Sequence, residues 1–435
     1  MSLSVAAHGI LKTHLTWDEV EHELQKAFNT KAHFGPNKSA TSISDFKGFM
    51  SKIALIEPDW QNVATDENLP EKFIVKISSQ LAFVELRNVM KMGTDEQFEK
   101  KIKQLTEVTR KFHNHEVESY RLLEKYAGGE IAITKIFATR KFDSENQLKG
   151  FIISEYIPDT QHIPLYESIS YEDIQPIVKA AALFSAVGEN MLEDELEYTK
   201  DHNMASIIGK FLDEENLNNV VSLLKEKFPT EHEDKIDEYF DIIKRFYAEP
   251  EFLMKYAKMH TFLRHKPVLI HCDLWSSNLL CTKSDDHHVK LKAIIDFQTV
   301  STGSPGIDLG RLFTSSLTAK DRREHLDDLL HLYYSTFIGK LAGKPQPYNF
   351  TQANSQRKGK YKKLFLQLKI SYNIAFPLLT LLVIPAMTPL LEQANVPENL
   401  RETMREAAIE KMVGLLEDAI ETHKRNVEEI PEFYN

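Results

Sequence analysis

The spacing of apolar and polar residues along the chain changes near residue 157. Before this point, short apolar runs rich in β-branched residues predict strands, and the first two of them flank a polar loop. One longer stretch, 95–126, carries apolar side chains at helical spacing and is followed by Gly128 and Gly129, which favour the end of a helix. The predicted strands cover 31–36, 47–56, 71–79, 130–142 and 150–157.

After Pro158 the apolar spacing is mainly helical, with polar faces between the apolar positions. The segment 267–312 interrupts this pattern with short apolar runs set among loops. The sequence therefore predicts the α+β class with two lobes, a small strand-rich N-terminal lobe over 1–157 and a larger, mainly helical C-terminal lobe over 158–435. The predicted helices cover 171–193, 203–225, 230–265, 319–343 and 398–425.

The stretch from Ile370 to Leu391 has no charged residue and is long enough to span a bilayer as one helix. Three prolines lie within it, and prolines kink or break a single span. We therefore predict one or two buried helices here and no transmembrane segment. The N-terminus has no basic leading region with a long apolar run, so we expect no signal peptide. The polar or helix-breaking residues of the stretch are Asn373, Pro377, Pro385 and Pro389.

Composition narrows the choice of partners and compartment. The formal net charge of -11 leaves no basic excess to neutralise phosphates, which argues against nucleic acid as a partner. Cys272 and Cys281 are too few for a disulfide framework, so we expect both to stay reduced in a cytoplasmic protein. The sequence carries no signal for an oligomeric state.

The residues on which a function can be based lie in one short segment. The apolar run Val268–Ile270 leads into a His-x-Asp-x-x-x-x-Asn arrangement formed by His271, Asp273 and Asn278. Asp296 ends a second apolar run 18 residues later. Phosphoryl transfer from ATP needs a carboxylate to orient the acceptor hydroxyl and two oxygen ligands for magnesium. Each residue alone would be explained by loop packing or strand capping, but their order and spacing favour this chemistry.

These motifs, completed by Ile295-Asp296-Phe297, resemble the aminoglycoside phosphotransferase and choline kinase superfamily, whose fold is protein-kinase-like. The Asp273-Leu274-Trp275 version is most similar to the ecdysteroid-kinase-like, or CHK-kinase-like, family. The resemblance covers most of the chain. It implies that Asp273 is the catalytic base and that Asn278 and Asp296 bind Mg²⁺.

The same resemblance implies structural roles around this segment. His271 would tie the catalytic loop down, and Asp308 would brace it. Since Asp308 follows a Pro-Gly turn and opens an apolar helix, the sequence also predicts that it caps the N-terminus of this helix. Cys272 departs from the family, which often has Gly there, and we expect the change to affect packing only.

Lys76 lies in a predicted apolar strand, where an ammonium group needs an anionic partner. The resemblance implies that this partner is Glu116 on the following helix and that the pair positions the α- and β-phosphates of ATP. Glu118 is close in sequence and leaves the helix register open. A lysine that extends to solvent from an edge strand is the alternative explanation for Lys76.

The rest of the expected nucleotide site is less distinctive. The phosphate-covering loop should lie between Gly35 and Gly48, but it lacks the Gly-x-Gly-x-x-Gly pattern, so Ser39 and Thr41 are candidates to contact phosphate. An ordinary polar hairpin explains this text equally well. The link between the lobes is expected at 154–157, with the backbone of Glu155 and Ile157 contacting adenine.

The sequence thus predicts an ATP- and Mg²⁺-dependent kinase that phosphorylates a hydroxyl of a small molecule. Trp275 and the apolar stretch after Ile370 favour a partly hydrophobic acceptor, such as a steroid, over a sugar; an amino alcohol also stays open. The alternative is a catalytically silent protein that binds a nucleotide or lipophilic ligand. A protein kinase is disfavoured because no Ala-Pro-Glu follows Asp296. A metal hydrolase using His271, Asp273, His287 and His288 is disfavoured because His287 and His288 lie in a charged turn.

Overall fold

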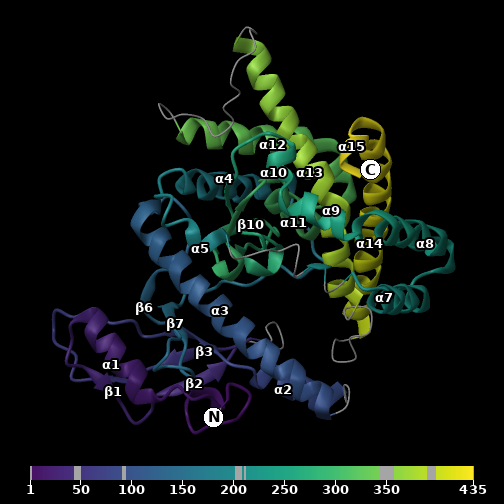
Figure 1. Cartoon of the computed structure of the whole chain (residues 1–435). Coiled ribbons are helices and arrows are strands. Elements are labelled where there is room, and N and C mark those ends of the chain that lie inside the picture. The colour runs from purple at the N-terminus through teal and green to yellow at the C-terminus, as the bar shows by residue number, and fades with distance from the viewer. Residues whose placement is uncertain are drawn as a thin grey trace. The chain divides into compact units, whose positions relative to one another are not determined.

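The computed structural model describes residues 2–43, 50–90, 95–200, 208–209, 212–341, 357–388 and 398–434 (Figure 1). The chain forms two compact units, and each is built from non-contiguous segments. The N-terminal unit comprises Met1–Glu124, Ile133–Asp159 and Asp296–Gln298. The C-terminal unit comprises Lys125–Ala132, Thr160–Ile295 and Thr299–Asn435.

The N-terminal unit is built on a five-stranded sheet of order β2-β3-β5-β7-β6, in which every pairing is antiparallel. Two further short strands, β1 and β4, pair with each other. The strands are β1 His33–Phe34, β2 Ser39–Ser42, β3 Ser51–Glu57, β4 Trp60–Gln61, β5 Phe73–Ser78, β6 Ile136–Arg140 and β7 Phe151–Glu155. The helices are η1 Ile10–Lys12, α1 Trp17–Phe28, α2 Leu81–Met90 and α3 Asp95–Ala127.

The side chains of β5 alternate between the hydrophobic core and the opposite face of the sheet. Phe73, Val75 and Ile77 are buried in one hydrophobic cluster with residues of α1, such as Val20 and Leu24. Because successive side chains of a strand point to opposite faces, Lys76 lies on the other face of the sheet. The strand itself therefore fixes the side on which Lys76 can meet a partner.

In this unit the predicted polar loop needs correction, and one helix was missed. The text predicted as a polar loop contains β2, which pairs with β3, whereas Phe34 pairs with Trp60 in the separate two-stranded sheet. Ser and Thr alternate there on an exposed edge strand, so no apolar alternation marked it. Helix α2 was not predicted. The predicted long helix and the strands after it are confirmed as α3, β6 and β7.

The C-terminal unit is mainly helical, as predicted. Its helices are α4 Tyr171–Gly188, α5 Glu197–Lys200, α7 Glu214–Lys227, η2 Thr230–His232, α8 Glu233–Ile242, the π-helical η3 Ile243–Tyr247, α9 Pro250–Ala257, α10 Met259–Phe262, α11 Gly306–Ser316, α12 Ala319–Lys340, α13 Arg357–Met387, α14 Glu398–Glu429 and α15 Pro431–Tyr434. Two antiparallel two-stranded sheets, β8 Val268–Ile270 with β11 Ser301–Gly303 and β9 Leu279–Lys283 with β10 Val289–Ile294, lie among them. The 3-10 turns are η4 Ser276–Asn278 and η5 Phe297–Thr299.

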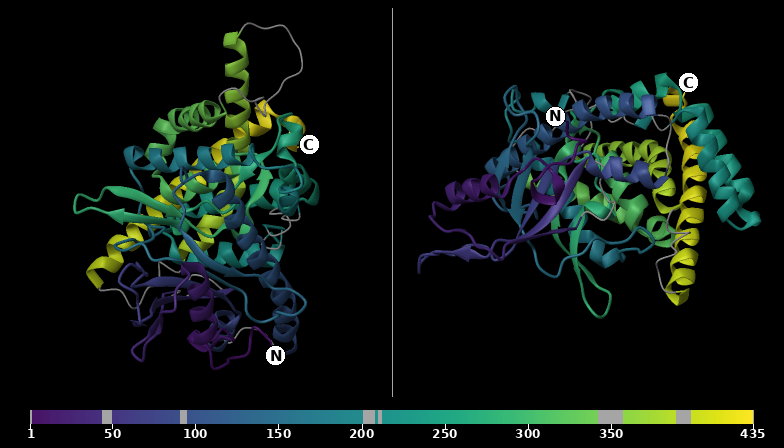
Figure 2. Two further views of the ribbon diagram at one scale, coloured as in Figure 1. Left: turned by 90° about the vertical axis from the view of Figure 1, so that its left-hand side faces the viewer. Right: turned by 90° about the horizontal axis from the view of Figure 1, so that it is seen from below.

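Helices α11, α13 and α14 form the packing centre of this unit. α11 begins at Gly306, where an added Cβ would lie 2.3 Å from the backbone of Tyr372 on α13, so only glycine permits this approach. Figure 2 shows α14, in yellow, running beside α8. The position of α11 matters most for function because this helix holds the loop that follows β8.

Helix α13 continues through Pro377 and Pro385 as a single helix, in agreement with the prediction of one or two buried helices. Pro377 has no N–H to offer the carbonyl of Asn373, four residues earlier. Asn426 on α14 donates its side-chain amide to that carbonyl at 2.8 Å. A neighbouring helix therefore supplies the donor that proline lacks. Pro389 lies outside the described residues.

Within the described residues, Leu366–Met387 is the one helical segment long and apolar enough to cross a membrane. In this structure 78% of the most apolar 18-residue window of that segment is buried. Burial of this extent is typical of the core helix of a large helical unit. The predicted helix 230–265 is instead divided into α8, η3, α9 and α10, with Pro250 at the start of α9.

Candidate functional site

The loop after β8 is a compact structure in the C-terminal unit. Its backbone is closed by two turns, in which the N–H of Trp275 donates to the carbonyl of Asp273 and the N–H of Asn278 donates to that of Trp275. The N–H of Ile295, at the end of the β9–β10 hairpin, donates to the carbonyl of Asn278 at 3.0 Å. These bonds fix Asp273 and Asn278 on one turn, as the motif spacing predicted.

Asp308 braces this loop from α11. Its buried carboxylate accepts the backbone N–H of His271 at 2.7 Å and that of Cys272 at 2.8 Å. Burial raises the pKa of Asp308 to about 6, while His271 and these two N–H groups oppose the rise. The predicted N-cap role is wrong, because Pro305 occupies the N-cap and Asp308 lies inside the first turn of α11.

Cys272 adopts a left-handed backbone conformation with φ of 65°. Glycine takes this conformation without strain, and other residues pay roughly 1 kcal/mol or more. The difference between Cys272 and the glycine usual in the family therefore concerns the backbone as well as packing, which corrects the expectation that only packing changes. The thiol is buried, and burial raises its pKa well above the usual value.

Both oxygens of Asp273 are held by neighbours in the C-terminal unit. Oδ1 accepts from Nε of Arg311 at 3.2 Å, and Oδ2 accepts from the amide nitrogen of Asn278 at 3.1 Å. The same amide nitrogen donates to the backbone carbonyl of Asp273 at 2.8 Å. Since Asn278 uses its nitrogen in this way, its amide oxygen is the atom left to bind a cation.

His271 ties the loop together, and the geometry indicates one tautomer. Its Nδ1 accepts the backbone N–H of Asp273 at 3.3 Å, while Nε2 lies 3.1 Å from the carbonyl of Ile295 and donates to it. The side chain is buried. His271 thus connects the loop to the end of β10, in line with a structural role.

Arg311 is the residue that sequence reasoning missed. It projects from the same face of α11 as Asp308 and Ser315, whose hydroxyl accepts the N–H of Ser276 at 3.1 Å. The guanidinium carbon lies 4.5 Å from the centroid of the Trp275 ring. One signal could have found it: a charged residue in the apolar helix text Ile307–Phe313 needs a buried partner.

In the N-terminal unit, Lys76 forms an ion cluster with two carboxylates. Its Nζ lies 2.8 and 2.7 Å from the two oxygens of Glu116 and 2.7 Å from Oδ1 of Asp296. Although burial alone would lower the pKa of Lys76, the two carboxylates outweigh it and raise the pKa above its usual value. Lys76 is therefore a half-buried, paired lysine rather than one that extends to solvent.

The choice between the two glutamates of α3 is settled by their contacts. Glu116 is 2% exposed and faces Lys76, whereas Glu118 pairs with Arg121 and Lys141. Burial raises the pKa of Glu116 to about 7, and the charge of Lys76 opposes this rise. A glutamate in such a site depends on its lysine to stay ionised.

Asp296 also has a left-handed backbone, with φ of 68°, which aspartate tolerates better than most residues. Its Oδ1 contacts Lys76 and its Oδ2 accepts from the amide of Gln298 at 3.3 Å. Asp296 belongs to the N-terminal unit and Asn278 to the C-terminal unit. Their joint binding of one magnesium ion therefore stays a prediction.

The other residues predicted for nucleotide binding are placed as follows. Ser39, at the start of β2, donates its hydroxyl to Glu57 at 3.1 Å, and Thr41 is exposed on the same strand. Glu155 ends β7, and its carboxylate accepts the backbone N–H of Lys135 at 2.7 Å. Ile157 follows as a half-buried residue. The expected end of the phosphate loop at Gly48 lies outside the described residues, so these roles remain predictions.

The histidines of the alternative metal site have other surroundings. His288 is exposed and lies 3.3 Å from both carboxylate oxygens of Asp173 at the β9–β10 turn, where His287 is exposed too. Among the described residues no three His, Cys, Asp or Glu side chains are grouped as metal ligands would be. The metal-hydrolase interpretation therefore gains nothing from the structure.

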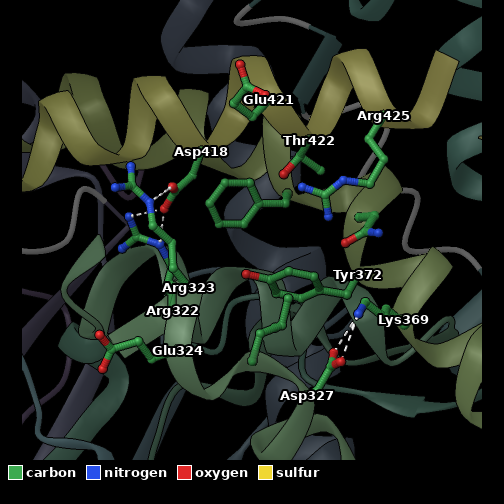
Figure 3. Close-up of a pocket in the computed structure, with 13 residues that line it drawn as sticks. Arg322, Arg323, Glu324, Asp327, Lys369, Tyr372, Asp418, Glu421, Thr422 and Arg425 are labelled. Atoms are coloured by element: carbon green, nitrogen blue, oxygen red, sulfur yellow. Dashed lines mark hydrogen bonds and ion pairs between the residues drawn. The ribbon is translucent and has the colours of Figure 1, made fainter. Parts of the chain in front are cut away.

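A cavity of about 440 Å³ lies between α12, α13 and α14 in the C-terminal unit (Figure 3). Arg322 and Arg323 both meet Asp418 there, and Lys369 meets Asp327. None of the residues predicted from the sequence to bind nucleotide or catalyse lines this cavity. Its charged side chains are largely paired with one another.

Two Caenorhabditis elegans proteins are similar in sequence. The one named "Uncharacterized oxidoreductase dhs-27" is 27% identical over 317 residues, which are 70% of this chain and 35% of that protein. The one named "Uncharacterized kinase-like protein D1044.1" is 35% identical over 85 residues, 20% of this chain and 21% of that protein. This chain thus spans about a third of the first relative and a fifth of the second.

Similar solved structures include the choline kinase from Cryptosporidium parvum Iowa II, with 13% identity and a TM-score of 0.47, covering 92% of this chain and 94% of that one. Another is the ADP-bound aminoglycoside phosphotransferase APH(2'')-Ib, with 14% identity and a TM-score of 0.39, covering 92% and 98%. A family match extends over residues 3–427, nearly the whole chain, and this protein therefore belongs to the DUF1679 family, described as "Uncharacterized oxidoreductase dhs-27".

Proposed function

We propose that this protein is an ATP- and Mg²⁺-dependent phosphotransferase that moves the γ-phosphate to a hydroxyl group of a small molecule. The observation that carries the proposal is the contact of Lys76 Nζ with both oxygens of Glu116, at 2.8 and 2.7 Å. A strand lysine held by a helix glutamate is the arrangement with which kinases position ATP phosphates. A lysine kept only for stability would not need two carboxylates around it.

The residues present fit a magnesium nucleotide. Lys76 lies between the carboxylates of Glu116 and Asp296, so the cluster has two acidic groups for one basic group, which suits a divalent cation. Carboxylate and amide oxygens are ligands that magnesium prefers, and the amide oxygen of Asn278 is left for this purpose. Magnesium ATP would supply the phosphoryl group and the charge that stabilises its transfer.

The acceptor would be handled by Asp273. A carboxylate held on both oxygens has a fixed orientation, and each oxygen keeps a second lone pair for an acceptor hydroxyl. Asp273 would orient that hydroxyl and take its proton as the phosphoryl group leaves ATP. His271, through its bond to the N–H of Asp273, and Asp308, through the two preceding N–H groups, would keep this carboxylate in place.

Hydride transfer, suggested by the name of the first relative, is less well supported for this chain. Dinucleotide sites of the Rossmann type use a parallel sheet and a Gly-x-Gly-x-x-Gly turn. The strand pairs of the described residues are antiparallel, and the sequence contains no such turn. The match also covers only 35% of that relative.

The test is incubation of the purified protein with labelled ATP, Mg²⁺ and a fractionated extract of small metabolites. A labelled product is expected with the wild-type protein and not with Asp273→Asn. Magnesium-dependent thermal stabilisation by nucleotide without any product would favour the catalytically silent binding protein instead. Neither stabilisation nor product would contradict both interpretations.

A further inference from the structure

Arg311 has a combination of features that stability alone does not explain. Its side chain is 8% exposed, and Nη1 is buried without a hydrogen-bond partner in the described part of the chain. An unpaired donor on a buried charged group is unfavourable, and an apolar residue of similar volume would avoid it. The structure nevertheless keeps an arginine here, directly beside the carboxylate of Asp273.

The contacts of Arg311 hold it in one orientation. Nε donates to Oδ1 of Asp273 at 3.2 Å, and the guanidinium carbon lies 4.5 Å from the Trp275 ring centroid. A planar guanidinium over an aromatic ring has little freedom to rotate. Asp308 and Ser315 also bind α11 to the loop. The position of Arg311 Nε relative to Asp273 is therefore fixed.

The two oxygens of Asp273 thus receive different partners. Asn278 holds Oδ2 and is itself a predicted magnesium ligand, so its position would depend on the metal. Arg311 holds Oδ1 from a different element and does not depend on the metal. Removing Arg311 would leave the carboxylate tied on one side only, free to turn about its side-chain bonds.

We propose that Arg311 is a positioning residue for the phosphoryl transfer: it fixes the rotamer of Asp273, so that one oxygen of this carboxylate faces the acceptor hydroxyl. This inference rests on the proposed function. It assigns Arg311 no contact with ATP. The loss of Arg311 should therefore lower kcat and leave nucleotide binding unchanged.

The test uses magnesium ATP hydrolysis, with water as the acceptor, so that no acceptor has to be identified first. Arg311→Met is expected to lower kcat about 10- to 100-fold with KM for ATP within about twofold, as for a lost positioning contact. Arg311→Lys keeps a cation near Oδ1 and should retain at least about five times the kcat of Arg311→Met. Rates are expressed per folded molecule, counted by binding of magnesium ADP.

Arg322 offers a matched control in the same unit. It is likewise buried, pairs with Asp418 at 2.7 Å and lies 5.8 Å from the centroid of the Phe376 ring (Figure 3). Arg322→Met removes the same kind of buried ion pair without touching the catalytic loop. Its kcat per folded molecule should stay within about twofold of wild type.

The double variant Asp273→Asn/Arg311→Met tests the route of the effect. If Arg311 acts through Asp273, the double variant hydrolyses ATP at the rate of Asp273→Asn within about twofold, because the second change has nothing left to disturb. Independent losses that multiply, or an unchanged kcat in Arg311→Met, would overturn the proposal while the phosphotransferase function stands. Absence of magnesium-dependent hydrolysis in wild type would overturn both.

Discussion

At the scale of single residues, Lys76 holds together two carboxylates that would otherwise repel each other. Glu116 is 2% exposed and has this lysine as its counterion, so Lys76→Met should leave a buried carboxyl group that has lost its partner and takes up a proton. We expect the free energy of unfolding to fall by about 3 kcal/mol, measured by urea denaturation. Lys76→Met/Glu116→Met, which replaces the pair with two apolar side chains, should recover most of this loss.

Lys72 provides the control for this prediction. It pairs with Glu57 at 2.7 Å, but both side chains are about half exposed, so solvent screens the pair. Lys72→Met should show no measurable change in the same denaturation experiment. If the double variant at 76 and 116 were less stable than Lys76→Met alone, the two residues would not be coupled as the distances suggest.

Asp273 and Asp296 should separate chemistry from binding. Asp273→Asn keeps the size of the side chain but removes the carboxylate that we propose as the base, so we expect turnover to fall about 10²- to 10⁴-fold. Nucleotide-induced thermal stabilisation should stay close to that of wild type. Asp296→Asn removes a charge that faces the cation and should weaken the magnesium-dependent part of that stabilisation. Equal turnover of wild type and Asp273→Asn would contradict the role of Asp273 as the base.

The sequence predicted the loop residues well and their surroundings poorly. His271, Asp273 and Asn278 could be recognised from the sequence because the chemistry fixes their spacing on one turn. Arg311 comes 38 residues after Asp273 and meets it only because α11 packs against the loop, a contact that no local pattern encodes. The left-handed backbone of Cys272 was equally hidden, since φ is set by the turn and not by the side chain.

At the scale of elements, a side-chain hydrogen bond links α14 to α13, because Asn426 donates to the carbonyl of Asn373. Asn426→Leu would leave the carbonyl of Asn373 without a donor inside the helix pair, which should lower the free energy of unfolding by about 1–3 kcal/mol. Pro377→Ala restores a backbone N–H at the position that lacks one. Adding it to Asn426→Leu should therefore recover part of the loss, as measured by denaturant melts of the single and double variants.

Pro377→Ala alone is the reference for that comparison, because alanine also removes a helix-breaking residue. If it stabilised wild type and Asn426→Leu by the same amount, the carbonyl of Asn373 would not be the point of coupling. The sequence located this helix from its apolar text but could not predict that it continues, since the rescuing donor lies 53 residues away. Strand β2 was missed because its residues show no alternation of apolar and polar side chains.

At the scale of the whole molecule, three buried histidines make stability sensitive to acid. Burial lowers the pKa of His113, His265 and His423 to about 4 in each case. Between pH 6.5 and 4 the unfolded chain binds protons that the folded protein does not, so stability should fall as the pH falls through this window. Calorimetric melts at half-unit steps of pH should show the melting temperature declining from about pH 6.5 downward.

His113 allows this origin to be checked. Its Nε2 donates to the carbonyl of Arg140 at 2.8 Å, a bond that a glutamine side chain can replace without titrating. His113→Gln should therefore flatten the decline by up to about 3 kcal/mol between pH 6.5 and 4, the linkage expected for a pKa shift of this size. Asp308, whose pKa is raised to about 6, acts in the opposite direction over the same range. A decline as steep as in wild type would exclude His113 as its source.

The large-scale layout was the easiest part to predict, because the change from strand-like to helical spacing is spread over hundreds of residues. Ends and interruptions of elements were harder. The long predicted helix 230–265 is broken where five residues form the π-helical turn η3 and where Pro250 starts a new helix. Tyr239 in α8 and Tyr247 at the end of η3 are both fully buried, so the apolar pattern continues through the first of these breaks.

Because both thiols are buried, the rate at which each one is labelled reports how often its surroundings open. The chain has two cysteines, Cys272 in the catalytic loop and Cys281 in β9, and burial raises the pKa of Cys281 to about 12. A maleimide reacts only with a thiolate that can reach it, so neither site reacts until its surroundings open. Labelling each cysteine over time, and reading the two positions by mass spectrometry, would therefore time the breathing of the loop separately from that of the neighbouring hairpin, without any foreign probe.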